Sequence, residues 1–276
     1  MAPAVDDARG FAGRTVLAVF AHPDDESLAC GGTLARLSDA GARVILLCAS
    51  RGNRGFVSDP ALVPDGDLGR VRANELREAA HALGGAEVLI FDHPDGNLRW
   101  ADVPELHAEI VSAIREYRPD AVITFAEDGL YGHLDHIGVH ERTCTAVRSL
   151  GDHAPSLYYV TMPKGVMREV VEAAIAKGWA RPSSGFWSIV PDAFGIAVRR
   201  PSFVVDVRAW VSHKLAALRC HGTQMGANSP FAQIDEADAR RWLGIEQFRR
   251  ARPHSGVPLL EQLADPVASL NARRRT

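Results

Sequence analysis

Short, continuously apolar segments alternate with amphipathic segments through the first half of this chain, and no other feature restricts its fold as strongly. The apolar segments predict buried strands at Thr15–Ala21, Arg43–Ala49, Glu87–Phe91, Asp120–Phe125 and Ser156–Thr161. The amphipathic segments predict helices at Ser27–Ala40, Leu68–Leu83, Val103–Tyr117 and about Leu134–Leu150. Because strands that are apolar throughout need cover on both faces, the alternation predicts an α/β fold. We expect a Rossmann-like, doubly wound, mostly parallel sheet with helices on both faces.

The alternation becomes less regular from Pro163 onward. The patterns there predict helices at Val166–Lys177, Ala209–Arg219 and Glu236–Arg250, and a hairpin over Phe194–Val207 with its turn near Arg200–Ser202. No linker rich in Gly, Ser or Pro precedes this region. We therefore interpret residues 1–276 as one domain, with a core over about 13–162 and a C-terminal elaboration over about 163–270.

The chain is weakly acidic, with 31 Lys and Arg residues against 34 Asp and Glu residues. This balance argues against a general nucleic-acid binder and against a polybasic membrane patch. The longest apolar runs have six residues, whereas a membrane-spanning helix needs about 18. The N-terminal residues do not resemble a secretory signal, and the four cysteines show no paired spacing. We expect a cytoplasmic protein whose partner is a small molecule, with no nucleic acid and no membrane. The sequence predicts no oligomeric state.

Two clusters of polar side chains follow predicted strands. His22, Asp24, Asp25 and Glu26 come directly after the first strand, and the segment Tyr131–His136 follows the fourth. Ligands of open α/β sheets bind outside the carboxyl ends of the strands, which is where both clusters fall. Helix capping accounts for one of the acidic residues, but not for three acidic residues and a histidine. If the first and fourth strands are neighbours, the two clusters face each other.

Histidine and carboxylate ligands without cysteine suit zinc, or another divalent metal such as Fe²⁺. A catalytic zinc usually has three protein ligands and one open position, and His22, Asp25 and His136 supply such a set. Asp24 is then left beside the metal as a candidate general base. The rival pair His136 and His140 lacks the glutamate of an H-E-x-x-H motif, so we expect His140 to have a supporting or packing role.

A dinucleotide site is not expected. The segment Cys30–Thr33 does not match G-x-G-x-x-G, and the acidic turn before it would repel a pyrophosphate. We expect Gly31 and Gly32 to allow close packing of the first helix instead.

Several motifs together resemble one family, the PIG-L/LmbE-like N-acetylglucosaminyl deacetylases. They are His22-Pro-Asp-Asp-Glu26, Arg72-x-x-Glu75-x-x-x-Ala79-x-x-x-Leu83-Gly84, Asp95-Gly96, Pro119-Asp-x-Val-x-Thr-Phe125, His133-x-Asp-His136 and Lys214…His221-x-Thr-Gln224. The resemblance spans most of the chain. It implies a Rossmann-like fold, a zinc site and hydrolysis of an N-acetyl group on a sugar.

The resemblance also implies roles for individual residues. It places the metal on His22, Asp25 and His136, and it makes Asp24 the base. It makes His133 the group that stabilises developing charge, and it gives Tyr131 and Asp135 assisting positions. Asp135 would keep His133 positively charged, as a neighbouring carboxylate does. Arg72 and Asp95 are interpreted as contacts to sugar hydroxyls or to an anionic aglycone. This sequence departs from the family pattern at Leu134, where proline is common, and at Ser50–Asn53, which differs from Thr-x-Gly-Glu.

Three functions are compatible with these residues. The leading hypothesis is a zinc-dependent hydrolase that removes the acetyl group from an N-acetylglucosamine-type sugar conjugate and releases acetate and a free amine. A second is a zinc-dependent amidase that cuts a larger amide, such as a thiol conjugate. The third is a metal-dependent binding protein without turnover, which the intact Asp24 disfavours because binding alone needs no base. The long aperiodic segment Arg51–Leu68 predicts a functional loop, such as a lid.

Overall fold

In the part of the chain that the structure describes, eight strands form one continuous sheet in the order β3-β2-β1-β4-β5-β7-β6-β8. The computed structural model describes residues 10–100, 103–179, 189–195, 200–226, 229–251 and 257–265. The strands are β1 (Thr15–Phe20), β2 (Arg43–Cys48), β3 (Glu87–Ile90), β4 (Ala121–Phe125), β5 (Ser156–Thr161), β6 (Phe203–Asp206), β7 (Ile245–Arg250) and β8 (Ala264–Asp265). The first five are parallel to one another, and β7, β6 and β8 continue the sheet through antiparallel pairs. The predicted α/β class is confirmed.

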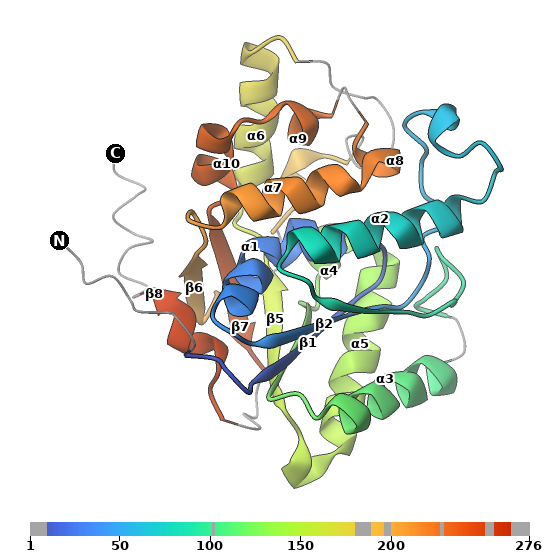
Figure 1. Cartoon of the computed structure of the whole chain (residues 1–276), viewed down its shortest axis with the longest axis vertical. Coiled ribbons are helices and arrows are strands. Elements are labelled where there is room, and N and C mark those ends of the chain that lie inside the picture. Colours follow the sequence, from blue (N-terminus) through green and yellow to red (C-terminus); the bar gives the residue numbers. More distant parts are fainter. Residues whose placement is uncertain are drawn as a thin grey trace.

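Helices cover both faces of this sheet (Figure 1). They are α1 (Asp25–Asp39), α2 (Leu68–Ala82), α3 (Val103–Tyr117), α4 (Gly129–Gly132), α5 (Leu134–Ser149), α6 (Val166–Ala176), α7 (Val211–Cys220), α8 (Gly222–Met225), α9 (Pro230–Gln233) and α10 (Glu236–Trp242). Helix α7 packs against α1 and α2 on one side, and α3 packs against α5 on the other. Both faces of the central strands are therefore shielded from water, and all residues of β1 and β4 except the half-buried Thr15 are buried.

The predicted helix over Glu236–Arg250 is wrong in its second half. The helix ends at Trp242, and residues Ile245–Arg250 form β7 between β5 and β6. Gly244 makes this break, since a Cβ there would lie 2.3 Å from the carbonyl oxygen of Arg240. Glu, Gln and Arg favour helices locally, but pairing with two strands of the sheet outweighs that preference.

The predicted hairpin over Phe194–Val207 does not supply the partner of its second strand. The described part of that strand, β6, pairs with β7 on one side and with β8 on the other. Residues 196–199, in the first half of the predicted hairpin, lie outside the described residues. The C-terminal strands that cap the sheet therefore come from segments far apart in the sequence, which local periodicity could not reveal.

A kink in α1 ties the central helix to the C-terminal region. Cys30 has non-helical backbone angles, so the backbone N–H groups of Gly32 and Thr33 are released from the helix. Both donate to the carboxylate of Glu246, at 3.0 and 2.7 Å. Lys214 donates to the same carboxylate at 2.5 Å. A Cβ on Gly32 would lie 2.5 Å from Val207, so the close packing expected at this glycine is confirmed.

Within the described part of the chain, no helix is both long enough and apolar enough to cross a membrane.

Candidate active site

Two turns at the carboxyl edge of the sheet come together because β1 and β4 are neighbours. The first turn carries His22 between β1 and α1, and the second leads from β4 to His136 in α5. The His136 ring stacks on Phe125, the last residue of β4, with ring centres 4.1 Å apart. The prediction that the two clusters face each other is confirmed. A pocket of about 350 Å³ opens onto them.

The hydrogen bonds of His136 determine which of its nitrogens has a lone pair. Nδ1 lies 3.2 Å from the Gly129 carbonyl oxygen, which can only accept, so Nδ1 carries the proton. Nε2 is then the basic nitrogen, and it is buried without a hydrogen-bond partner among the described residues. Asp25 Oδ1 lies 3.1 Å from Nε2. A buried lone pair that faces a carboxylate is an arrangement that a cation satisfies and a hydrogen bond does not.

Three carboxylates surround the other predicted ligand, His22. Its Nε2 lies 3.0 Å from Asp135 Oδ2 and 3.1 Å from Asp95 Oδ1, and its Nδ1 lies 3.5 Å from Asp25 Oδ2. Burial lowers the pKa of His22, but hydrogen bonds with Asp135, Asp25 and Asp95 outweigh burial and raise it well above the ordinary value. This point in the structure therefore stabilises positive charge. The bonds at Nε2 also leave Nδ1 facing Asp25, and the ring centres of His22 and His136 lie 5.3 Å apart.

The residues present fit a divalent metal. Asp25 lies beside both predicted histidine ligands, His22 and His136, and imidazole and carboxylate groups are the donors that zinc and Fe²⁺ accept. One ring nitrogen of each of His22, His133 and His136 also lies within 4.8 Å of the other two. His140, the alternative considered from the sequence, instead places Nδ1 2.8 Å from the Phe125 carbonyl oxygen.

A second group with metal-like spacing consists of His22, Asp95 and Asp135. Its carboxylates are already engaged, because Asp95 accepts from the Arg54 N–H and Asp135 accepts from the N–H groups of Gly96 and Leu98. Burial raises the pKa of Asp95, but the hydrogen bond from His22 and the charge of His22 outweigh it and lower the pKa to about 2. We therefore interpret these two aspartates as supports that orient His22.

Asp24 lies beside this cluster in a strained backbone conformation. Its φ of 123° is rarely adopted by residues other than glycine, and its backbone N–H is held by Glu26 Oε2 at 3.0 Å. The Asp24 side chain is 22% exposed and lines the pocket. Burial raises the pKa of Asp24 to about 6, although the charge of Arg72 opposes the shift. A carboxylate with a pKa near neutrality, open to a pocket, is suited to accept a proton.

Arg72 is buried and holds the turn that carries Asp24. Its guanidinium donates to Asp24 Oδ2 at 3.1 Å and to the carbonyl oxygens of Pro23 and Gly52. Arg72 and Asp95, the two residues predicted to contact substrate, both line the pocket. Both guanidinium NH2 groups of Arg72 and both carboxylate oxygens of Asp95 contact the protein, whereas Arg72 Nε has no hydrogen-bond partner among the described residues, so each residue also positions a neighbouring site residue.

His133 differs from the sequence prediction in its charge. The Asp135 carboxylate contacts His22, and only the backbone N–H of Asp135 reaches His133, donating to Nδ1 at 3.2 Å. Burial lowers the pKa of His133 to about 4, with the charges of His136 and His22 acting in the same direction. The expectation that Asp135 keeps His133 positively charged is therefore not met. The lowered pKa favours the neutral form of His133 although the charges of Asp25 and Asp135 oppose the shift, and in that form Nε2 carries the proton because Nδ1 accepts.

Tyr131 lies in α4, a short turn whose residue Leu130 also has a positive φ, 66°. The Tyr131 ring centre lies 5.3 Å from that of His136 and 5.8 Å from that of His133, and the side chain lines the pocket. Burial raises the pKa of its hydroxyl well above the ordinary value. Tyr131 therefore keeps its proton and remains a hydrogen-bond donor at physiological pH.

Several residues that line the pocket were not singled out from the sequence. They are Leu28, Arg54, Gly55, Phe56, Ile189 and Met225, and Gln224, which was named from the sequence only as part of a motif, also lines the pocket. Arg54, Gly55 and Phe56 belong to the long segment Arg51–Leu68, whose lack of periodicity was the signal that it contributes to function. Gln224 belongs to the last of the motifs that resemble the deacetylase family.

Two other residues of this motif, His221 and Thr223, form hydrogen bonds that hold the backbone around the site. The buried His221 places Nε2 2.8 Å from Glu26 Oε1, and the other oxygen of Glu26 holds the backbone of Asp24. Thr223 donates from its backbone N–H and its hydroxyl to Glu75, both at 2.7 Å. The region after α7 is therefore fastened to the turn after β1 and to α2. The sequence showed the motif but not these partners.

A family model described as PIG-L, GlcNAc-PI de-N-acetylase, matches residues 17–147 of this chain. A 1D-myo-inositol 2-acetamido-2-deoxy-alpha-D-glucopyranoside deacetylase from Thermobispora bispora is 35% identical, over 86% of this chain and 88% of the relative. A protein of the same name from Geodermatophilus obscurus is 34% identical, over 88% of this chain and 94% of the relative.

Solved structures share the fold. A conserved protein from Thermus thermophilus superposes with a TM-score of 0.59 at 25% identity, covering 88% of this chain and 97% of its own. The N,N'-diacetylchitobiose deacetylase from Pyrococcus horikoshii has a TM-score of 0.58 at 22% identity, covering 93% of this chain and 88% of its own.

Proposed function

This chain belongs to the PIG-L family of de-N-acetylases, and from that premise we propose that it hydrolyses the N-acetyl group of an N-acetylglucosamine-type conjugate. The products are acetate and the free amine of the sugar. The two relatives compared above are named for an N-acetylglucosaminyl inositol, which makes this compound the substrate to test first. The alternative substrate class, a larger amide such as a thiol conjugate, is not favoured over it.

One observation carries the proposal. A carboxylate suited to accept a proton, Asp24, opens into the same pocket as His22 and Asp25, and Asp25 in turn contacts His136. A binding protein would need the donors alone. Amide hydrolysis needs both, because water must lose a proton as it attacks a poor electrophile.

We assign the metal to His22, Asp25 and His136 and propose zinc as the ion. When bound there, a divalent ion supplies Lewis acidity, which lowers the pKa of water and polarises an amide carbonyl. Asp135 and Asp95 orient His22 from behind, and the Gly129 carbonyl orients His136.

Asp24 moves the proton in this mechanism. Its Oδ2 is held by Arg72, which leaves Oδ1 to take a proton from the attacking water and to deliver it to the departing amine. The raised pKa of Asp24, about 6, suits both steps because the group can exist in either protonation state near neutral pH.

His133 and Tyr131 stabilise the negative charge that develops on the former carbonyl oxygen. Neutral His133 offers the Nε2 proton, and Tyr131 offers its hydroxyl proton. Both are donors before substrate arrives, so little reorganisation is needed when the charge develops.

The test measures two products of one reaction. Zinc-loaded protein is incubated with N-acetylglucosaminyl inositol, and acetate and primary amine are quantified in parallel. Equimolar release of both supports the proposal, and free N-acetylglucosamine serves as a comparison substrate to show the contribution of the aglycone. If folded, zinc-loaded protein releases no acetate from any N-acetylglucosamine conjugate supplied, the proposed function is wrong.

A further inference from the structure

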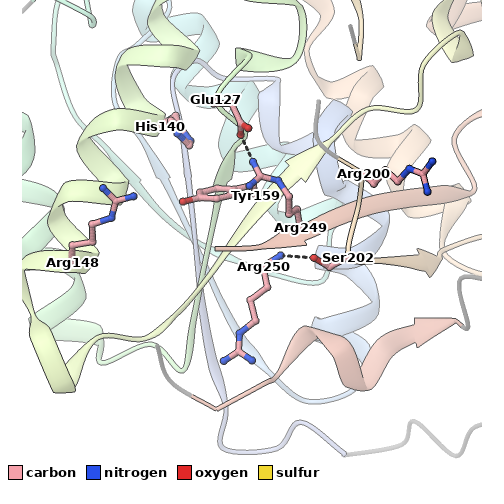
Figure 2. A pocket seen from close by; sticks show the side chains of 8 residues that line it. All are labelled: Glu127, His140, Arg148, Tyr159, Arg200, Ser202, Arg249 and Arg250. Atoms are coloured by element: carbon pink, nitrogen blue, oxygen red, sulfur yellow. Dashed lines mark hydrogen bonds and ion pairs between the residues drawn. The ribbon is translucent and has the colours of Figure 1, made fainter. Parts of the chain in front are cut away.

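A second pocket, of about 490 Å³, lies apart from the candidate active site (Figure 2). It is formed by α5, by β5 and β7, and by the segment that leads into β6, and it shares no described lining residue with the first pocket. Its volume falls in the range of about 300–1,000 Å³ that is usual for small-molecule sites. Nothing in the proposed deacetylation requires it.

The pocket is strongly basic. Among the described residues, four arginines line it, namely Arg148, Arg200, Arg249 and Arg250, against one acidic residue, Glu127. Its lining therefore carries a net charge of +3 in a chain whose net charge is −3. Like charges gathered around a hollow repel one another, and a bound anion relieves that repulsion.

Two of the arginines are held in place by the protein. Arg249 forms an ion pair with Glu127, and its guanidinium lies 4.7 Å from the centre of the Tyr159 ring. Arg250 lies 3.7 Å from Glu261, and its backbone N–H donates to Ser202. Figure 2 shows the Arg249 side chain beside Tyr159 with its contact to Glu127. These guanidiniums are positioned before any ligand arrives, which lowers the entropy cost of binding.

Three of the arginines, Arg148, Arg200 and Arg249, still have guanidinium N–H groups that can bind a ligand. Arg249 Nε is buried and has no hydrogen-bond partner among the described residues. The side chains of Arg148 and Arg200 are exposed, and no described residue forms a hydrogen bond or ion pair with either. Figure 2 shows Arg148, on α5, and Arg249, on β7, on opposite sides of the Tyr159 side chain.

His140 adds no positive charge to this pocket. Its Nδ1 donates to the Phe125 carbonyl at 2.8 Å, and burial lowers the pKa of the ring. The arginines are therefore the groups that select a ligand. Guanidinium groups bind phosphate and carboxylate oxygens through paired, charge-assisted hydrogen bonds.

We propose that this second pocket binds a small polyanion, that is, a molecule with two or more phosphate or carboxylate groups. One anionic group is bound between Arg148 and Arg249, which line the pocket from α5 and β7. A small molecule fits better than a nucleic acid, because the site is a hollow in a chain of net negative charge.

The test is a calorimetric titration of the metal-loaded protein with pyrophosphate, and separately with citrate, at low ionic strength. Wild-type protein should bind at least one of the two saturably, and the tighter ligand identifies the preferred anionic group. The variant Arg148→Gln should weaken binding at least tenfold, because one charge-assisted hydrogen bond is lost. Arg249→Gln is a second variant, in case the first changes only the rim of the pocket.

Arg115→Gln is the matched control. Arg115 and Arg148 are both exposed arginines in the last turn of a helix, and Arg115 does not line the pocket. This control should bind within twofold of wild type. Equal weakening in Arg115→Gln and Arg148→Gln would show a response to overall charge and would overturn the proposal. Unchanged affinity in both pocket variants would place the anion elsewhere, including at the metal, and absence of saturable binding would overturn the proposal as well.

Discussion

Asp24→Asn separates proton transfer from every other task at the candidate active site. Asparagine has nearly the same shape as aspartate, and its carbonyl oxygen can accept the hydrogen bond from Arg72 that Asp24 accepts at 3.1 Å. The backbone N–H at this position remains bonded to Glu26. Asparagine also tolerates positive φ, so the 123° conformation does not oppose the change. We therefore expect the variant to fold normally.

The expected loss is confined to the chemical step. The asparagine side chain of the variant cannot accept a proton from water at neutral pH, and loss of a positioned general base costs about 10²–10⁴-fold in kcat. This range corresponds to about 2.7–5.4 kcal/mol of transition-state stabilisation. The contacts of His22, Asp25 and His136 do not involve the side chain of Asp24, so we expect zinc to be retained.

The assay combines acetate release with metal analysis of the same purified sample. Asp92→Asn is the matched control, because the Asp92 side chain is 80% exposed and contacts only Arg51 in the described structure. The control should keep wild-type activity, and Asp24→Asn should keep its zinc while losing turnover. A variant that lost zinc in proportion to activity would show that Asp24 is a metal ligand or supports one. That result would refute the assignment of Asp24 as the base and Asp25 as the ligand.

Three further variants and one treatment test the remaining assignments. His136→Ala should lose most of the bound metal, as measured by elemental analysis, and full occupancy would contradict its role as a ligand. His133→Ala should keep the metal and lose about 10²–10³-fold in kcat, because a donor to the developing charge is removed; a change in KM alone would make it a positioning residue. Lys214→Met should lower the free energy of unfolding by about 3–5 kcal/mol in a urea titration, because it leaves the carboxylate of Glu246, 2% exposed, without its cation. Treatment with a chelator should abolish acetate release and added zinc should restore it, whereas persistent activity in metal-free protein would exclude a metal mechanism.

Local pattern was sufficient for the central sheet and for the position of the site. The five parallel strands begin and end within one residue of the predicted bounds, because segments buried on both faces must be apolar throughout. The clusters at His22 and His136 could be placed opposite each other because a doubly wound sheet makes β1 and β4 neighbours. The antiparallel edge was not predictable in the same way. Residues Ile245–Arg250 favour a helix on their own and form a strand only because β5 and β6 offer backbone partners.

The partners of individual polar side chains were decided by tertiary structure alone. The sequence by itself determined which polar residues follow the carboxyl ends of β1 and β4, since their places are fixed by the order of the chain, and it predicted roles for them. It did not determine that Asp135 contacts His22 rather than His133, that Arg72 binds Asp24, or that arginines from α5, β7 and the segment before β6 surround one hollow. The physical reason is the distance along the chain between the residues that each feature involves. Hydrophobic periodicity is a property of neighbouring residues and is visible in any short window, whereas a hydrogen bond or ion pair depends on positions, within a few tenths of an ångström, that exist only after distant segments have packed.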